Sequence, residues 1–413
     1  MSPRMGLPPP APSTTMTLPS PPSPSSLHPW QVIGAGICAL VLTVGLARFA
    51  YTPLLPLMRA DAGLSAAQGG WLATFNYLGY LLGTLLVARV GDPQRRFRFY
   101  RAGLLLAVAA TALMGCTTRP WLWSVLRFIA GMSSTAGLLL ASGLVLNWLL
   151  AQRRRPRLGL HFAGLGLGIA VSGLATALLA GHAGSSGQWV WLGLLGVVFL
   201  VPAWRWMPAP AAPSAAHLAS APPPPSRRWR VLLVAAYFCA GFGFAIGATF
   251  IVAILEQTAV FSGHGSAVWV LVGLAAVPST FLWDRLAARV GMIRALWVAF
   301  ALQALSFVLP LLDDGLAAGV GSALLFGITF AGIVSLTLTV VGRHYPQNPA
   351  AAMATLTLSY GVAQIIAPAV AGMLARDSGS YRASLLLATI LMAIGIVLLA
   401  GMREAARHPQ QQM

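Results

Sequence analysis

Two arginines stand among residues that would otherwise dissolve in hydrocarbon. Arg48 lies within LVLTVGLARFAYTPLLPL (40–57), and Arg127 lies within the apolar run 121–147. A guanidinium keeps its charge in a protein, and placing one at the centre of a membrane helix costs at least ~2.5 kcal/mol. Each arginine is therefore expected to face a partner or a cavity. The planar guanidinium can grip a carboxylate with two parallel hydrogen bonds, so anion binding is the first chemistry to consider.

Few carboxylates could neutralise these two arginines. The chain has eight acidic residues, and only Glu256 is expected within a span, near its outer end. Two interpretations follow. In one, the surplus positive charge of Arg48 binds an anionic substrate. In the other, the guanidinium groups bond backbone carbonyls, hydroxyls and water, and Glu256 pairs with Arg48 as an outer gate. For Arg127, a role in coupling or in helix packing is an equal alternative.

Neutral polar side chains on other apolar runs could complete a substrate site. Tyr360 and Gln364 are four residues apart and share one helical face, as do Arg48 and Thr52. For each neutral residue the alternative is an interhelical hydrogen bond. The predicted substrate-binding set consists of Arg48, Thr52, Asn76, Tyr80, Tyr237, Thr249, Tyr360 and Gln364.

The composition places these residues in a membrane protein. Of the 413 residues, 57% are hydrophobic and only 8% are charged, whereas soluble domains carry about a quarter charged residues. The net charge of +18 could suggest nucleic acid as a partner. The arginines, however, occur in short clusters between apolar runs, which indicates membrane topology instead. No nucleic-acid partner, cofactor or metal site is predicted, and the three cysteines imply no disulfide framework.

The apolar runs predict twelve transmembrane helices, since one span needs roughly 20 mostly apolar residues. With the N-terminus in the cytosol, 20 arginines fall on the cytosolic side and 4 on the outer side. The positive-inside rule therefore predicts that both termini are cytosolic. Pro53, Pro56, Pro278 and Pro368 predict kinks or interruptions within spans. The expected spans are 31–57, 67–88, 100–117, 121–147, 158–181, 187–206, 231–261, 266–286, 291–311, 315–342, 350–375 and 382–402.

The spans divide into two sets of six. The tetrapeptide ARVG occurs at 88–91 and again at 288–291, each time at the cytosolic end of the second span of its half. This repeat predicts an all-α membrane protein with two six-helix bundles related by pseudo-twofold symmetry, an arrangement typical of alternating-access transporters. The predicted divisions are a disordered cytosolic tail (1–29), the N-terminal bundle (30–206), a Pro/Ala-rich cytosolic linker (207–229), the C-terminal bundle (230–404) and a cytosolic tail (405–413).

Several segments carry a family resemblance. GLARFAYTPLLPLM (45–58), GGWLATFNYLGYLLG (69–83) and LTLSYGVAQIIAPAVAGMLA (356–375) resemble the YbfB/YjiJ-type bacterial branch of the major facilitator superfamily. The resemblance implies the fold of that superfamily, in a multi-pass protein of the bacterial inner (plasma) membrane. It also implies a proton-coupling role for Arg127, because Arg127 and Gly131 match the R-x-x-x-G pattern of the superfamily's fourth span.

One motif departs from the superfamily. The loop after the second span usually reads G-x-x-x-D-R-x-G-R-R, but Ala88 and Ala288 replace its aspartate in the two copies. Asp92 and Asp284 are the candidates to replace the missing carboxylate. The predicted coupling and gating residues are Arg127, Glu256, Arg89, Asp284 and Arg289.

These features predict a secondary active transporter, not an enzyme. It would be a proton-coupled monomer in the lipid bilayer that moves a small solute by alternating access, with preference for an organic anion or carboxylate. The alternative is proton-driven efflux of hydrophobic or drug-like compounds, although the fifth span lacks the Gly-Pro pair of drug/proton antiporters. A third hypothesis, an integral-membrane transferase, lacks the paired-acid, His-Asp or metal cluster that such chemistry needs.

Overall fold

The chain folds into a bundle of membrane-length helices. The computed structural model describes residues 27–152, 158–210, 226–344 and 349–407. Within these ranges eleven helices are long and apolar enough to cross a membrane, and a bent pair of helices supplies a twelfth span. The bend between the two helices of that pair measures 42°. The predicted all-α membrane fold with twelve spans is therefore confirmed.

The first six spans contain two π-helical segments. The first span is α1 (Pro29–Leu40), the π-helix η1 (Val41–Phe49) and α2 (Tyr51–Ala62). The fourth is α5 (Pro120–Thr135), the π-helix η3 (Ala136–Ala141) and α6 (Ser142–Ala151). The others are α3 (Ala66–Ala88), α4 (Pro93–Leu113) with the 3₁₀ turn η2 (Met114–Cys116), α7 (Leu158–Leu179) and α8 (Ser185–Arg205).

The second six spans begin with the long helix α9 (Arg227–Leu255). The bent pair follows, and the remaining four spans are single helices. Their bounds are α10 (Gly265–Ala276) with α11 (Ser279–Val290), α12 (Met292–Leu312), α13 (Leu316–His344), α14 (Pro349–Ser378) and α15 (Arg382–Arg407).

The end of α9 differs from the predicted span 231–261. The helix stops at Leu255, and residues 256–263 form turns. The Thr258 hydroxyl donates to the Leu255 carbonyl at 2.7 Å, and Gly263 adopts a φ of 76°. A polar side chain that bonds a helix-end carbonyl and a residue with positive φ both favour termination. Glu256 consequently lies beyond the span.

A proline bends one span, and another proline follows a change of helix type. The bend in the eighth span falls at Val277–Pro278, and the first span changes from the π-helix η1 to the α-helix α2 at Ala50, three residues before Pro53. A proline removes one backbone donor and crowds the carbonyl four residues earlier. The predicted interruption at Pro278 is confirmed, whereas residues 29–62 form one membrane-length span. Pro56 and Pro368 lie inside the helices α2 and α14.

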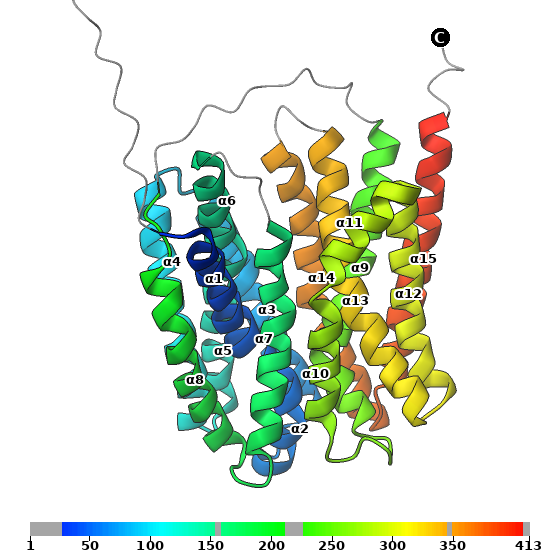
Figure 1. The fold of residues 1–413 in the computed structure, drawn as a ribbon. Coiled ribbons are helices and arrows are strands. Elements are labelled where there is room, and N and C mark those ends of the chain that lie inside the picture. Colours follow the sequence, from blue (N-terminus) through cyan, green and yellow to red (C-terminus); the bar gives the residue numbers. More distant parts are fainter. Residues whose placement is uncertain (1–26, 153–157, 211–225, 345–348, 408–413) are drawn as a thin grey trace, which may run out of the picture.

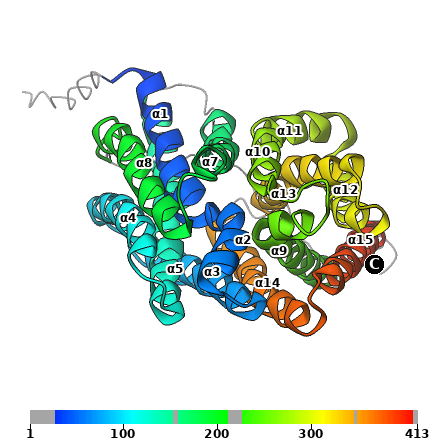
Figure 2. The ribbon, with the colours of Figure 1, turned by 90° about the horizontal axis from the view of Figure 1, so that it is seen from below.

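The helices form two groups that lie side by side (Figures 1 and 2). One group holds α1–α8 and the other α9–α15. They meet where α7 packs on α10, α3 on α14, and α2 on α9. We call the face where α1 begins and α15 ends the terminal face, and the face where α2 and α9 end the opposite face. The tail 1–29 and the linker 207–229 lie largely outside the described residues, and the domain boundaries stay a prediction.

Glycines allow the two groups to pack closely. A Cβ at Gly70 of α3 would meet the backbone of Pro368 and Gly372 on α14. A Cβ at Gly273 of α10 would meet the backbone of Ala170 and Gly166 on α7. Small residues let membrane helices approach until backbone touches backbone, which gives the van der Waals contact that replaces a hydrophobic driving force in lipid.

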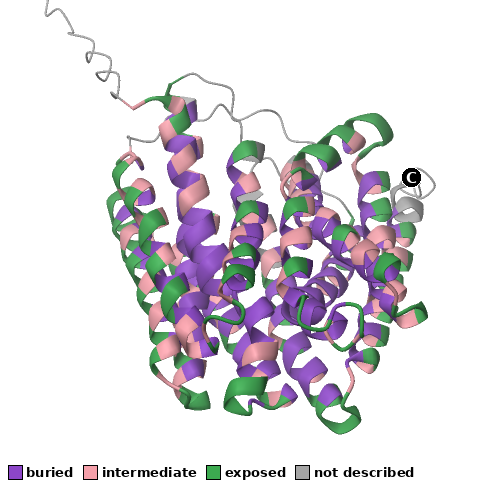
Figure 3. Ribbon diagram, turned by 60° about the horizontal axis from the view of Figure 1, so that its bottom comes forward, coloured by how far each residue is buried: buried purple, intermediate pink, exposed green. Residues whose placement is uncertain are grey.

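Exposed residues lie along the outside of the bundle (Figure 3), and many of them are large apolar side chains. Leu178, Val198 and Val397 are 69%, 64% and 69% exposed, respectively. In contrast, Arg48 and Arg127 are only 4% and 3% exposed. Apolar side chains on the perimeter and charges in the interior fit a protein whose surrounding solvent is hydrocarbon.

The contact between η1 and α7 predicts that a glycine-to-alanine substitution destabilises the protein at one position and not at another. A Cβ at Gly45 would lie 2.6 Å from the carbonyl oxygen of Gly168, whereas a Cβ at Gly143 would meet nothing within 4 Å. We expect Gly45→Ala to lower the free energy of unfolding by about 1–3 kcal/mol, because backbone must move. Gly143→Ala should leave it unchanged or raise it, since alanine favours helix. Thermal unfolding of the detergent-purified variants tests this, and equal melting temperatures would contradict the packing argument.

Candidate functional site

Arg127 bonds the backbone of the first span. Its two terminal nitrogens donate to the carbonyl oxygens of Ala47 and Arg48, each at 3.1 Å. These carbonyls lie near the end of the π-helix η1, where the span changes to the α-helix α2. The Arg127 guanidinium also lies 4.4 Å from the ring centroid of Tyr51. Arg127 therefore ties the fourth span to the backbone of the first at the point where its helix type changes.

Arg48 is held by aromatic rings. Its guanidinium carbon lies 4.5 Å from the ring centroid of Tyr80, 4.8 Å from that of Tyr77 and 5.4 Å from that of Phe49. Its buried Nε has no hydrogen-bond partner. Desolvated cation–π contacts contribute about 2 kcal/mol or more, so three rings offset part of the cost of burial. They leave the positive charge without a neutralising acid.

The rings around Arg48 continue into the second group of helices. Tyr77 lies 6.4 Å from Phe244 of α9, and Phe244 lies 5.9 Å from Tyr360 of α14, measured between ring centroids. Tyr360 also stacks near Tyr237 of α9 at 4.5 Å. The hydroxyl of Tyr360 is close enough to Arg48 to interact electrostatically. We call the set of these rings with Phe49 and Tyr80 the central aromatic cluster.

The central aromatic cluster brings together half of the predicted substrate-binding set. Arg48, Tyr80, Tyr237 and Tyr360 lie within it, and Thr249 lies beside the hydroxyl of Tyr77. The structure thus places residues of four spans around one arginine. Whether they bind substrate stays a prediction.

The other three members of the predicted set lie outside the central aromatic cluster. Two of them donate hydrogen bonds to backbone carbonyls, and the third lies farther along α14. The Thr52 hydroxyl donates to the carbonyl of Ala248, which joins α2 to α9. The amide of Asn76 donates to the Arg127 carbonyl at 2.9 Å. Gln364 is buried on α14, one turn beyond Tyr360. For Thr52 and Asn76 the geometry fits the interhelical hydrogen bond that was the alternative.

The predicted coupling and gating residues do not form one cluster. Arg89 follows α3 directly, and Asp284 and Arg289 lie on α11; all three are exposed. Asp92 caps α4 by accepting from the backbone N–H groups of Gln94 and Arg95, each at 3.1 Å. The gating role of these residues stays a prediction.

Glu256 is not the partner of Arg48. Its carboxylate accepts from the backbone N–H of Gly265, at the start of α10, at 3.1 Å. It lines a pocket at the opposite face, together with Arg59. The sequence interpretation that paired Glu256 with Arg48 is therefore wrong, because α9 ends before Glu256 and turns its side chain toward α10.

Three further rings surround the site: Phe49, Tyr77 and Phe244 contact Arg48 or its neighbouring rings. The sequence offered Tyr77 beside Asn76 and Tyr80 on the second span as a neutral polar candidate, although it is not in the predicted substrate-binding set. Phe49 follows Arg48 directly but is apolar, so its residue type gave no signal. Nothing in the sequence indicated Phe244, because its contact depends on how the two groups of helices meet. Within the described residues, no cluster of three His, Cys, Asp or Glu side chains could hold a metal ion.

Comparisons with known proteins agree with this architecture. Residues 40–400 match the family described as "Uncharacterised MFS-type transporter YbfB". The gentisate transporter of Corynebacterium glutamicum is 24% identical over 344 residues, which cover 78% of this chain and 76% of that protein. A putative metabolite transport protein of Haemophilus influenzae is 27% identical over 151 residues, 37% of this chain and 36% of its own length.

Two solved structures share the fold. The nucleoside transporter NupG superposes with a TM-score of 0.71 at 13% sequence identity, covering 92% of this chain and 99% of that one. A bacterial homologue of the human lysosomal transporter Spinster, in an inward-facing and unoccupied conformation, gives a TM-score of 0.66 at 14% identity. That match covers 93% of this chain and 98% of the homologue.

The helix bundle and its relatives define a multi-pass membrane transporter of small solutes with the major facilitator fold. The chain belongs to the YbfB-type family of the major facilitator superfamily, because the family match spans residues 40–400. The family predicted from the sequence is confirmed.

The carbonyl contacts of Arg127 predict a structural role that can be measured without a substrate. Arg127→Gln should lower the free energy of unfolding by several kcal/mol, since each buried carbonyl left unpaired costs about 1–3 kcal/mol. Arg119→Gln removes an exposed arginine and serves as the matched control. Thermal unfolding in detergent measures both. If the two variants had the same melting temperature, Arg127 would not stabilise the first span.

Proposed function

We propose that the protein is a secondary active transporter that carries a small organic anion by alternating access between its two groups of helices. The observation that carries the proposal is Arg48, a buried guanidinium that pairs with no acidic side chain among the described residues and has aromatic neighbours from both groups. Charges inside a membrane commonly mark substrate or ion pathways. A carboxylate is the complement that fits this planar cation.

The central aromatic cluster favours an aromatic carboxylate over an aliphatic one. The ring centroids of Tyr77 and Phe244 lie 6.4 Å apart, and those of Phe244 and Tyr360 lie 5.9 Å apart, beside the positive charge. Ring pairs prefer offset or edge-to-face contacts with centroids 4.5–7 Å apart, so an aromatic acid could stack while its carboxylate binds Arg48. The gentisate transporter among the relatives supports this class, since gentisate is an aromatic carboxylate.

The orientation in the membrane follows from charge. The 20 arginines that the sequence assigns to one side include those at the terminal face, which we propose to be cytosolic in the bacterial inner membrane. The opposite face, with Arg59 and Glu256, then lies outside the cell. One chain contains both groups of helices and the central aromatic cluster, which supports a monomer as the transporting unit.

Substitution of Arg48 tests the anion proposal. Arg48→Gln should reduce uptake of gentisate or benzoate into proteoliposomes at least about 100-fold, since losing a charge-assisted bidentate contact costs several kcal/mol. Arg48→Lys should retain part of the activity. Arg119→Gln is the matched control and should transport like the original chain. Folding is checked by gel filtration and thermal unfolding. Carboxylate uptake that survives Arg48→Gln would remove Arg48 from the site. If the original chain transported neutral aromatic compounds but no carboxylate, the alternative function, transport of hydrophobic compounds, would be favoured.

Proton coupling gives a separate prediction. Proteoliposomes with an acidic exterior and an alkaline lumen should accumulate the carboxylate above its external concentration. A proton ionophore should reduce uptake to equilibration, because no other gradient is present. Vesicles without protein provide the control for passive entry of the protonated acid. Equal accumulation with and without the pH gradient would show that protons do not drive transport.

A further inference from the structure

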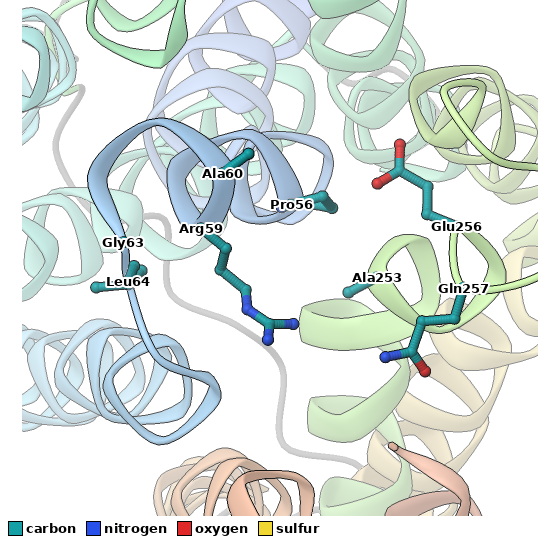
Figure 4. A pocket seen from close by; sticks show the side chains of 8 residues that line it. All are labelled: Pro56, Arg59, Ala60, Gly63, Leu64, Ala253, Glu256 and Gln257. Carbon is teal, nitrogen blue, oxygen red and sulfur yellow. The ribbon is translucent and has the colours of Figure 1, made fainter. Parts of the chain in front are cut away.

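A second charged site lies near the opposite face, away from the central aromatic cluster. A pocket of about 440 Å³ opens between the ends of α2 and α9. Its walls include Pro56, Arg59 and Leu64 from the first group of helices, and Ala253, Glu256 and Gln257 from the second. Figure 4 shows the Arg59 side chain reaching into this space from α2, with Glu256 and Gln257 on the facing wall. We call this space the outer pocket.

The two charges of the outer pocket do not neutralise each other. Arg59 contacts the hydroxyl of Tyr381 at 3.4 Å, a neutral partner. The Glu256 carboxylate accepts from the backbone N–H of Gly265. Neither charge is within ion-pair distance of the other among the described residues. The outer pocket is large enough for a small molecule. It presents to that molecule the Arg59 guanidinium, which has no carboxylate within ion-pair distance among the described residues.

The outer pocket lies on the same helical seam as Arg48. Arg48 and Arg59 are eleven residues apart along the first span, which corresponds to roughly 16 Å. Thr52, between them, bonds α2 to α9 through the Ala248 carbonyl. Tyr51 bonds the Gly69 carbonyl of α3 at 2.7 Å, and Thr74 bonds the Ile365 carbonyl of α14 at 2.8 Å. These contacts lie between the outer pocket and the central aromatic cluster, so they separate the two arginines in this conformation.

We propose that the outer pocket is a capture site where Arg59 binds the carboxylate of an arriving anion before the α2–α9 seam opens toward Arg48, and that Glu256 makes this capture depend on external pH. The inference rests on the proposed anion transport. It adds a second binding site at the outer surface and assigns Glu256 a different role from the pairing with Arg48.

The sign of the pH dependence follows from charge. Burial raises the pKa of Glu256, and the Gly265 N–H lowers it in part. An ionised Glu256 repels a carboxylate in the same pocket, whereas a protonated Glu256 does not. Anion binding should therefore strengthen as the external pH falls through the raised pKa. The titratable and charged groups on the surrounding elements include Arg59 and Asp61 of α2, His264 before α10, Tyr381 before α15 and Arg382 at its start. Asp61 accepts from the backbone N–H of Ser185 at 2.6 Å.

Charged thiol reagents test the outer pocket without knowledge of the natural substrate. Gln257→Cys, made in a Cys116→Ser chain because Cys116 is exposed, is modified in intact cells. The reagents are the anionic methanethiosulfonate ethylsulfonate and its cationic trimethylammonium analogue. Both reagents react with the same thiolate, so the ratio of their two reaction rates does not depend on how far the thiol is ionised. We expect the anionic reagent to be favoured at the acidic end of a pH titration, and the ratio to fall about fivefold or more as the pH rises through the raised pKa of Glu256.

Two added substitutions assign the effect to single charges. Glu256→Gln should keep the ratio high at both ends of the titration. If the ratio still fell with rising pH in Glu256→Gln, the pH dependence would belong to His264, and the role of Glu256 would be overturned. Arg59→Gln should lower the ratio about fivefold or more at both ends of the titration. An unchanged ratio in Arg59→Gln would overturn Arg59 as the anion-binding group.

Benzoate protection separates this inference from the proposed function. Benzoate should slow modification of Gln257→Cys, and should do so equally when Arg48→Gln has abolished uptake. Protection that disappears with Arg48→Gln, or that is absent in both chains, would overturn a distinct capture site even if carboxylate flux through Arg48 is intact. Conversely, if the original chain carries no carboxylate, the proposed function fails while protection at the outer pocket would still establish an anion site there.

Discussion

The pair of hydrogen bonds from Arg127 to the carbonyls of Ala47 and Arg48 is the constraint on which the central site depends. The first span changes there from a π-helix to an α-helix, and a membrane offers no water to satisfy backbone groups that lack a partner in the helix. An arginine supplies several donors in a rigid plane, so one side chain can bond two successive carbonyls. The guanidinium of Arg127, the second candidate for anion binding, is thus hydrogen-bonded to the protein's own backbone.

Arg127 is engaged by backbone carbonyls in this way, whereas Arg48 is surrounded mainly by aromatic rings. The rings attract its positive charge but carry no negative charge that neutralises it. The arrangement also links the two groups of helices, since the rings reach from Phe49 and Tyr77 to Phe244 and Tyr360. A ligand that contacts both sides of such a cluster can favour one arrangement of the helix groups over another, which is the physical requirement for a carrier.

Much of the fold was predictable because the bilayer imposes strict rules on sequence. The length of apolar runs placed twelve spans, and the bend at Pro278 followed from the missing proline N–H. The end of α9 was not predictable from hydropathy, since Phe261 and Val260 extend the apolar run beyond Glu256 while the local turns end the helix. Within the site, Arg48, Tyr80, Tyr237 and Tyr360 were identified by residue type. Thr52 and Asn76 could not be distinguished from binding groups, because their partners are backbone carbonyls that any residue could provide.

The sequence by itself determined that the chain spans the membrane many times, that it resembles a known transporter family, and that its buried arginines outnumber its buried acids. These properties depend on residue type and on order along the chain, which hydrophobicity and charge report directly. The tertiary structure alone decided which arginine is satisfied, which rings surround the other, and that Arg59 and Glu256 share a pocket without pairing. Those outcomes depend on the angles at which helices meet across sequence separations of up to about 300 residues, and local patterns carry no information about such contacts.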